Sequence, residues 1–302
     1  MSSKIKLTFL GTSASIPTSK RNHTGILLTY KSENILIDCG EGIQRQIRKA
    51  KLNPCKINKI LITHWHGDHV LGLAGLFQTL TLNDCNRKME IFGPKGIKKS
   101  IEKLSKVFFL DFKFESNTKE ILEKGIFFEN DDFYLEAEKM EHGARTNAYN
   151  FVVKDKLRVD KDKLKEFKVP SGKHLLPLLK GKDIKYRGKK YSFKDLTYAE
   201  KGKKVSIVLD TKNNSRIVPF VQGADLFVCE SSFSDSDLEM AKEHLHMTAG
   251  EAGKIAKEAK AKKLILTHIS QRYDNKLEVL LENTKKNFKK VVIAKDLDIF
   301  KI

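Results

Sequence analysis

The chain has 302 residues, 40% of them hydrophobic, which is enough to bury a sizeable core in one large domain or two smaller ones. No apolar run approaches the ~20 residues that cross a bilayer and no signal-peptide core follows the start, so we expect a cytoplasmic protein with no membrane partner. Lys and Arg outnumber Asp and Glu by 57 to 38, a net charge of +19, which indicates a polyanionic partner unless the lysines merely solvate the surface.

Short apolar runs recur along the chain, and several end in a residue capable of chemistry. The runs lie at 7–10, 35–37, 59–63, 205–209, 226–229 and 264–267. Runs of this kind are typical of strands buried on both faces, and ligands gather where such strands end. Helices are expected between them at 43–50, 97–107 and 249–261, the last with Thr248 as its N-cap. The alternation predicts an α/β layered domain in which two sheets contribute to one seam.

The six residues 64–69 read His-Trp-His-Gly-Asp-His and directly follow the apolar run at 59–63. Imidazole and carboxylate are the ligands that Zn²⁺ prefers when a coordination position stays open for water, whereas closed structural sites rely on Cys. The stretch therefore predicts a catalytic metal site at the end of a strand. The alternative is a His-rich surface loop that binds metal only adventitiously.

Three single residues complete the candidate ligand set: His142, Asp210 and His268. Taken alone each is weak, because a lone His is more often a hydrogen-bonded core or surface residue and a strand-end Asp is more often a turn former. With residues 64–69 they supply seven donors, enough for two metal ions if one carboxylate bridges them. Two such ions ~3.5–4 Å apart can share and activate a hydroxide and stabilise a phosphoryl oxygen during in-line displacement.

The order of these residues resembles the metallo-β-lactamase superfamily, whose signature is H-x-H-x-D-H followed by a distant His, Asp and His. More narrowly, the chain resembles the ribonuclease Z family of endonucleases, which remove 3′ trailers from precursor tRNA, from about residue 5 to about residue 275. The stretches that carry the closer match are 9–14 with Pro17, Arg21 and Asn22, 38–42 with Gln44 and Gln46, 72–76, His142 with Tyr149, 246–248, and 266–273.

The resemblance implies a fold, a ligand set and a cofactor. The fold would be an α/β four-layer αββα sandwich, a single domain over 1–302 with an inserted, projecting basic arm at 151–200. The cofactor would be two Zn²⁺ per subunit, with Mn²⁺ or Fe²⁺ able to use the same ligands. One ion would be held by His64, His66 and His142, the other by Asp68, His69 and His268, with Asp210 bridging them.

The resemblance also implies catalytic roles. Asp68 would orient and help deprotonate the attacking water, and His246 would protonate the departing 3′ oxygen with Glu230 orienting it. The family writes the two loops of the His246–Glu230 pair as His-Ser-Thr and His-Glu-Ala-Thr, whereas this chain has His-Met-Thr at 246–248 and Cys-Glu-Ser-Ser at 229–232. His244 is a rival two residues upstream, although only His246 is followed by x-Thr.

Positive charge is concentrated between residues 151 and 204, which hold 18 Lys or Arg and 7 Asp or Glu. Such a segment is typical of phosphate-backbone binding, and its leucines argue for packing against the alternative of a disordered basic linker. The resemblance implies an arm that grips tRNA, although Lys168 and Lys173 stand where the family's tip has Gly and Pro. Candidate tRNA-binding residues are Lys168, Lys173, Lys180, Lys182, Lys185 and Arg187.

Three functions remain open. The first is a dinuclear zinc endoribonuclease that removes the 3′ trailer of precursor tRNA by metal-hydroxide attack and leaves a 3′-hydroxyl, acting as a homodimer as the resemblance implies. The second is a phosphodiesterase of the same fold for a small substrate such as a cyclic nucleotide. The third is a basic RNA-binding protein with an inactive metal site. The scattered cysteines 39, 55, 85 and 229 are expected to be free, buried thiols in a reducing compartment.

Overall fold

The computed structural model describes residues 4–110 and 113–302 and divides them into two compact units. The larger unit contains the chain up to Phe128, Leu135–Phe151 and Lys204–Ile302. The smaller unit contains Glu129–Tyr134 and Val152–Lys203. The smaller unit therefore includes most of the basic segment at 151–204.

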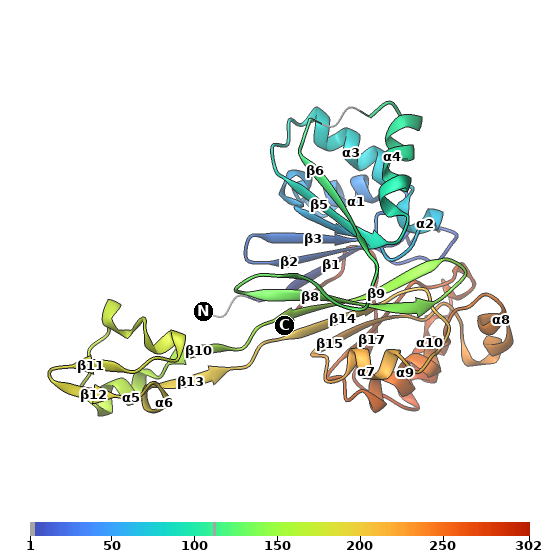
Figure 1. The fold of residues 1–302 in the computed structure, drawn as a ribbon. Helices are drawn as coiled ribbons and strands as arrows, with labels where there is room; N and C mark the ends of the chain where they lie inside the picture. The colour runs from blue at the N-terminus through green and yellow to red at the C-terminus, as the bar shows by residue number, and fades with distance from the viewer. Residues whose placement is uncertain (1–3, 111–112) are drawn as a thin grey trace. The chain divides into compact units, whose positions relative to one another are not determined.

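Two seven-stranded sheets form the centre of the larger unit (Figure 1). The first has the order β18 (Ile299–Lys301), β1 (Lys6–Gly11), β2 (Gly25–Tyr30), β3 (Glu33–Ile37), β4 (Lys59–Leu61), β5 (Met89–Pro94), β6 (Ser116–Ile121). The second has the order β17 (Val291–Ile293), β16 (Leu264–Thr267), β15 (Leu226–Glu230), β14 (Lys204–Val208), β9 (Arg145–Val153), β8 (Phe133–Glu141), β7 (Gly125–Glu129). The pairs from β3 to β6 and from β14 to β17 are parallel. All six predicted strands are confirmed within these parallel stretches or beside them.

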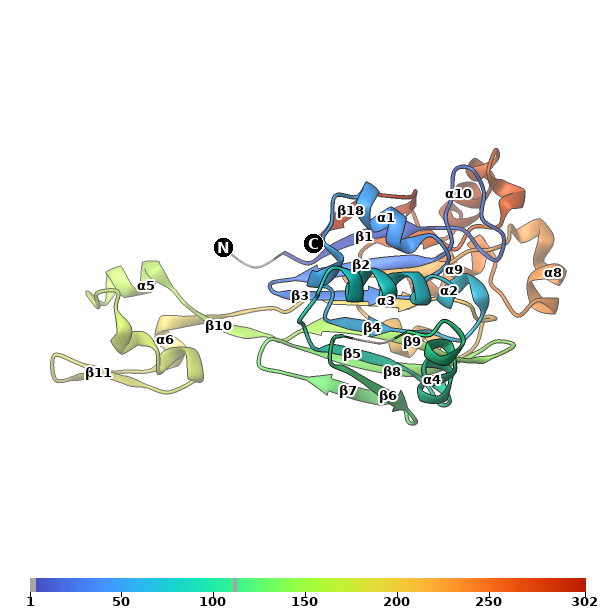
Figure 2. The same cartoon turned by 90° about the horizontal axis from the view of Figure 1, so that it is seen from above.

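Helices cover the outer face of each sheet, as the two views of the ribbon show (Figures 1 and 2). The first sheet carries α1 (Ile43–Lys49), α2 (Gly67–Val70), α3 (Leu73–Leu82) and α4 (Ile97–Val107). The second carries α7 (Ile217–Val221), α9 (Ala249–Glu258) and α10 (Leu277–Lys285), and α8 (Leu238–Glu243) lies to one side of that sheet. Thr248 caps α9 in a reciprocal capping box with Glu251, which confirms the N-cap predicted there. Short 3-10 turns lie at Pro54–Lys56, Lys173–Leu175, Leu178–Lys180, Asp235–Asp237 and Gln271–Tyr273.

Alternation along the strands explains why four layers form. In β3, Leu36 packs among the residues of α1 and α3, whereas Ile35 and Ile37 point toward the second sheet. There they meet apolar side chains of the second sheet, and the hydroxyl of Tyr149 donates to the carbonyl of Ile62 at 2.6 Å. Strands buried on both faces need continuous apolar runs, which is the pattern read from the sequence. The αββα sandwich is therefore confirmed.

The smaller unit has its own sheets and its own apolar core. It pairs β10 (Lys156–Val159) with β13 (Thr197–Glu200) and β11 (Ile184–Tyr186) with β12 (Lys189–Tyr191), and adds α5 (Lys161–Glu166) and α6 (Phe193–Leu196). Its buried side chains are Leu164, Val169, Leu175, Leu178, Ile184 and Leu196. The unit is folded, so the alternative of a disordered linker is wrong.

The cysteines depart in part from expectation. Cys39 and Cys229 are buried and free as expected, but Cys55 and Cys85 form a disulfide. The first 3-10 turn and the loop after α3 bring their Cα atoms to 5.2 Å, well within the range for a bridge. A separation of 30 residues concealed this proximity, because no C-x-x-C spacing marks it. Within 4–110 and 113–302, no helix combines the length and the apolar character needed to cross a membrane.

Candidate metal centre

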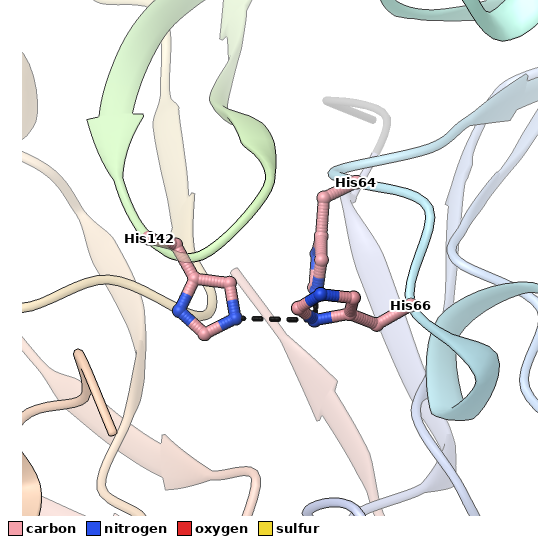
Figure 3. Close-up of side chains that lie close together, drawn as sticks. All are labelled: His64, His66 and His142. Atoms are coloured by element: carbon pink, nitrogen blue, oxygen red, sulfur yellow. Dashed lines mark hydrogen bonds between the residues drawn. The ribbon is translucent and has the colours of Figure 1, made fainter. Parts of the chain in front are cut away.

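Three histidines meet at one side of the site (Figure 3). His64 and His66 come from the loop between β4 and α2, and His142 comes from the turn between β8 and β9. His66 Nδ1 lies 3.0 Å from His64 Nε2 and 3.2 Å from His142 Nε2. Residues 76 positions apart in sequence therefore direct three ring nitrogens at one point.

A second group lies beside the first, and Asp210 faces both. Asp68, His69, Asp210 and His268 bring donor atoms within 4.8 Å of one another. Asp210 Oδ1 lies 3.1 Å from His268 Nε2 and 3.4 Å from His69 Nε2. Its other oxygen, Oδ2, lies 3.6 Å from His64 Nε2 and 3.7 Å from that of His142. The carboxylate therefore presents one oxygen to each group, and all seven predicted ligands converge.

Backbone geometry at the strand ends aims these side chains. Asp210 and His268 follow shortly after the parallel strands β14 and β16, which place their carboxyl ends along one edge of the second sheet. Both residues adopt positive φ, 28° at Asp210 and 56° at His268, as does Asp38 after β3 at 57°. Non-glycine residues in this region cost free energy and persist where the surrounding structure holds them. The strain therefore marks the same edge that the strand-end pattern predicted.

The donor set fits divalent metal ions. Ligand bonds of 2.0–2.1 Å in a tetrahedral zinc site place neighbouring nitrogens about 3.4 Å apart, close to the separations of His64, His66 and His142. Asp210 Oδ1 is buried, and although His268 and His69 lie close to it, no donor in the described part of the chain meets it with hydrogen-bond geometry. A buried carboxylate oxygen left in this state costs free energy unless a cation meets it.

In four of the candidate ligand histidines, the Nδ1 atom, which points away from the site, lies close to an oxygen of the protein. His69 Nδ1 lies 2.6 Å from Asp38 Oδ2, and His142 Nδ1 lies 3.1 Å from the carbonyl of Leu245. Both oxygens only accept, so each ring in its neutral, metal-binding form carries its proton on Nδ1 and turns a lone pair on Nε2 into the site. Thr63 and Ser232 hydroxyls lie 3.0 and 2.9 Å from the Nδ1 atoms of His64 and His268.

Asp38 is fully buried and has a role in the site that was not predicted from the sequence. Besides His69 it accepts hydrogen bonds from the backbone and the hydroxyl of Thr63, each at 2.7 Å. It thereby ties the strand that precedes the His cluster to one member of that cluster. The available signal was its position directly after the apolar run at 35–37.

Burial and charge act in opposite directions on the ionisable groups. Burial, with the neighbouring His69 adding to it, lowers the pKa of His64 to about 2, which keeps that ring neutral and able to ligate. Burial acts against the charge on Asp210, but the interactions with His268 and His69 outweigh it and hold the pKa of the carboxyl well below its usual range. Burial likewise opposes the charge on Asp68, and its hydrogen bonds with His268 and His69 lower its pKa.

The predicted proton donor lies beside these groups. His246 Nδ1 is 3.0 Å from Glu230 Oε1, and its ring centre is 5.0 Å from that of His142. Glu230 is fully buried and also accepts from the backbone of Thr211 at 2.7 Å and from Ser232 at 2.8 Å. Burial favours the neutral ring, but the charge and hydrogen bond of Glu230 outweigh it and raise the pKa of His246 to about 9. His244, the rival, stacks on Phe233 instead.

An open cleft of about 400 Å³ gives access to the site. Its lining includes His66, Asp68, His142 and His246, with Phe233 at one side. The candidate tRNA-binding residues all lie on the smaller unit and are all exposed: Lys168, Lys173, Lys180, Lys182, Lys185 and Arg187.

The comparisons with known proteins agree with this arrangement. Residues 5–169 match the family model described as "Anti-Pycsar protein Apyc1". The chain is 38% identical over 289 residues to the ribonuclease Z of Nanoarchaeum equitans, covering 96% of this chain and 90% of that protein. The structure of the short form of human tRNase Z is similar, with a TM-score of 0.73, 26% identity and 98% of each chain covered. The metallo-β-lactamase fold protein YhfI of Bacillus subtilis shares the fold, with a TM-score of 0.73 at 19% identity over 99% of this chain and 100% of that one.

Proposed function

This chain belongs to the ribonuclease Z family, its residues 5–169 also to the family described as Anti-Pycsar protein Apyc1, and we propose that it is a cytoplasmic zinc endoribonuclease. Its substrate would be precursor tRNA, from which it removes the 3′ trailer and leaves a 3′-hydroxyl. The observation that carries the proposal is the position of Asp210, which offers one oxygen to each of two ligand groups.

Each group would hold one Zn²⁺, two per subunit. His64, His66 and His142 would ligate one ion, Asp68, His69 and His268 the other, with Asp210 shared between them. When bound, the ions would lower the pKa of a water molecule and offset the negative charge of the phosphodiester. Asp68 and Asp210 are held in the ionised form and would offset part of the positive charge of the ions, which supports a site for more than one ion.

The protein's own residues move the protons. Asp68 Oδ2 is held by the backbone N–H of Ser15 at 2.9 Å and lines the cleft, so it can accept a proton from the attacking water. The water oxygen bonds to phosphorus as the bond from phosphorus to the 3′ oxygen breaks. His246 donates a proton to that oxygen, and Glu230 keeps the ring oriented and charged beforehand.

The smaller unit would bind the body of the tRNA. Support comes from the exposure of all six candidate cations and from the unit's independent core, which presents them on a folded surface. We include a homodimer in the proposal, following the family resemblance; sedimentation of the purified protein tests that part separately.

The decisive experiment uses one end-labelled precursor tRNA. Purified enzyme should cut once at the start of the trailer and leave a 3′-hydroxyl, chelation should abolish the cut, and added Zn²⁺ should restore it. A cyclic nucleotide serves as the parallel substrate. Turnover of the cyclic nucleotide without tRNA cleavage would replace the proposal with a small-substrate phosphodiesterase, and metal-independent RNA binding without cleavage would leave an inactive RNA-binding protein.

A further inference from the structure

A second hollow of about 250 Å³ lies on the larger unit beside the ligand cluster. Trp65, Pro94 and Ile97 form its apolar walls, and Lys95 and Arg145 stand at its rim. These residues come from the His cluster loop, from the end of β5 and the start of α4, and from the start of β9. Nothing in the reaction described above uses this hollow.

The chain connects the hollow directly to the cleft that holds the candidate ligands. Trp65 stands between His64 and His66, and Gly143 separates His142 from the residues at the hollow's rim. Gly143 is exposed, and a Cβ built on it would meet only the Cε1 atom of His66, at 3.9 Å. Position 143 therefore places no side chain between the residues that line the two cavities.

The chemistry of the hollow matches a nucleotide. Apolar walls that include an indole ring suit the flat face of a base. Lys95 and Arg145 are exposed, and among the described residues neither pairs with a carboxylate, so both are available to a phosphate. Arg145 Nη1 lies 3.5 Å from the carbonyl of Lys95, which keeps the two cations on one rim.

The positive character of the rim comes from these side chains and not from the helix end. The backbone N–H of Gly96, at the start of α4, already donates to Glu120 Oε1 at 2.9 Å. Glu120 thus places a carboxylate beside Gly96, and a phosphate at this rim would depend on Lys95 and Arg145 rather than on the N-terminus of α4.

We propose that this hollow binds the first nucleotide of the 3′ trailer, with its base against Trp65 and a following phosphate on Lys95 and Arg145. This assignment rests on the proposed function. The departing 3′ oxygen must face His246, which lines the cleft together with Phe233 and His244. The nucleotide that carries that oxygen therefore occupies the cleft, and the nucleotide on the other side of the phosphate leaves over Gly143 toward the hollow.

The test changes the substrate as well as the enzyme, because Trp65 neighbours two candidate ligands. Precursor tRNA carrying an abasic site at the first trailer position should be cleaved by the wild type with kcat/KM about tenfold below that of the intact substrate, since stacking of one base contributes about 1–3 kcal/mol. The same abasic site at the fifth trailer position should have no effect, which controls for the modification itself.

The enzyme-side test is the double variant Lys95→Ala with Arg145→Ala. It should lower kcat/KM on the intact substrate about fivefold, from two exposed charge contacts at about 0.5 kcal/mol each. It should also weaken inhibition by a 5′-phosphorylated trailer dinucleotide. The matched control, Lys103→Ala with Lys106→Ala, removes two exposed cations from the far part of α4 and should change neither value.

The outcomes separate this inference from the proposed function. Cleavage that ignores both the first-position abasic site and the double variant would overturn the trailer site while leaving the endonuclease intact. An equal loss of kcat/KM in the double variant and in its control would show that only net charge matters, and this result would also overturn the trailer site. Absence of tRNA cleavage by the wild type would instead remove the proposed function itself.

Discussion

Three lysines of the smaller unit offer a quantitative test of how the enzyme holds tRNA. Lys173, Lys180 and Lys182 are exposed, and within the described residues none has a carboxylate partner. Each cation that neutralises a phosphate releases counterions, so log Kobs falls with log salt by about 0.7–0.9 per contact. Replacing all three lysines with Ala should reduce the steepness of that dependence by about 2–3.

The same relation sets the expected loss of affinity. At 0.15 M salt, three contacts contribute roughly a hundredfold to the binding constant of precursor tRNA, so the triple variant should have a Kd roughly a hundred times that of the wild type. The chemical step should be unaffected, because the ligand groups lie in the larger unit. Single-turnover cleavage at saturating enzyme should therefore proceed at the parental rate.

The structure supplies a control with equal net charge. Lys163, Lys190 and Lys201 belong to the same unit but pair with carboxylates at 2.9, 3.0 and 2.7 Å. Their replacement removes three cations that are already neutralised locally, so affinity and salt dependence should change only slightly. Filter binding or fluorescence anisotropy from 50 to 300 mM salt measures both triples. Equal slopes for the two triples would refute the assignment of Lys173, Lys180 and Lys182 to phosphate contacts.

Three further predictions concern the site and the disulfide. Asp68→Ala should reduce cleavage at least about a hundredfold while tRNA affinity stays within about fivefold, as general-base loss predicts; a collapse of binding in an anisotropy assay would contradict that role. His246→Ala should slow cleavage about 10²–10⁴-fold. A substrate with a 3′-thiolate leaving group, which needs no proton, should recover most of the rate. Cleavage of the ordinary substrate at the parental rate would exclude the proton-donor role. The Cys55–Cys85 bridge closes a 30-residue separation, so its reduction should lower the unfolding free energy by about 3.6 kcal/mol in urea titrations. The variant Cys55→Ala with Cys85→Ala should not respond to reductant, and an unresponsive wild type would show that the bridge adds no stability.

The layered fold was accessible from the sequence because its strands are buried on both faces. Continuous apolar runs such as 35–37 and 264–267 carry that information locally, and each gave a strand at the expected place. Most ligand residues were accessible for a related reason, since the residues at 64–69, Asp210 and His268 follow these runs, whereas His142 follows none of them. The grouping of the ligands came only from the family resemblance, because the distance between His66 and His142 depends on how the turn between β8 and β9 approaches the first sheet.

The Cys55–Cys85 disulfide and the buried residues of the smaller unit could not be predicted from local sequence patterns. Cys55 and Cys85 approach only because α3 packs beside the first 3-10 turn, which spacing does not encode. In the smaller unit, Leu175 and Leu178 are buried whereas Leu176 and Leu179 are 56% and 42% exposed. A Leu-rich run of this kind indicates packing without stating which of its members pack.

Asp38 links Thr63, which precedes the His cluster, to His69, which belongs to it. The parallel register of β3 and β4 pairs Ile37 with Leu61, so the next residues of each strand, Asp38 and the segment leading to Thr63, also lie together. Positive φ at Asp38 then turns its carboxylate to accept from Thr63 and to meet His69 at 2.6 Å. A change of register by one residue would direct this side chain to the other face of the sheet and leave His69 without its anchor. The geometry of the candidate metal centre therefore depends on strand pairing as much as on the ligands, which is why an Asp38→Asn protein should lose metal affinity, about 10–100-fold by competition with a chelator, although Asp38 itself belongs to neither ligand group.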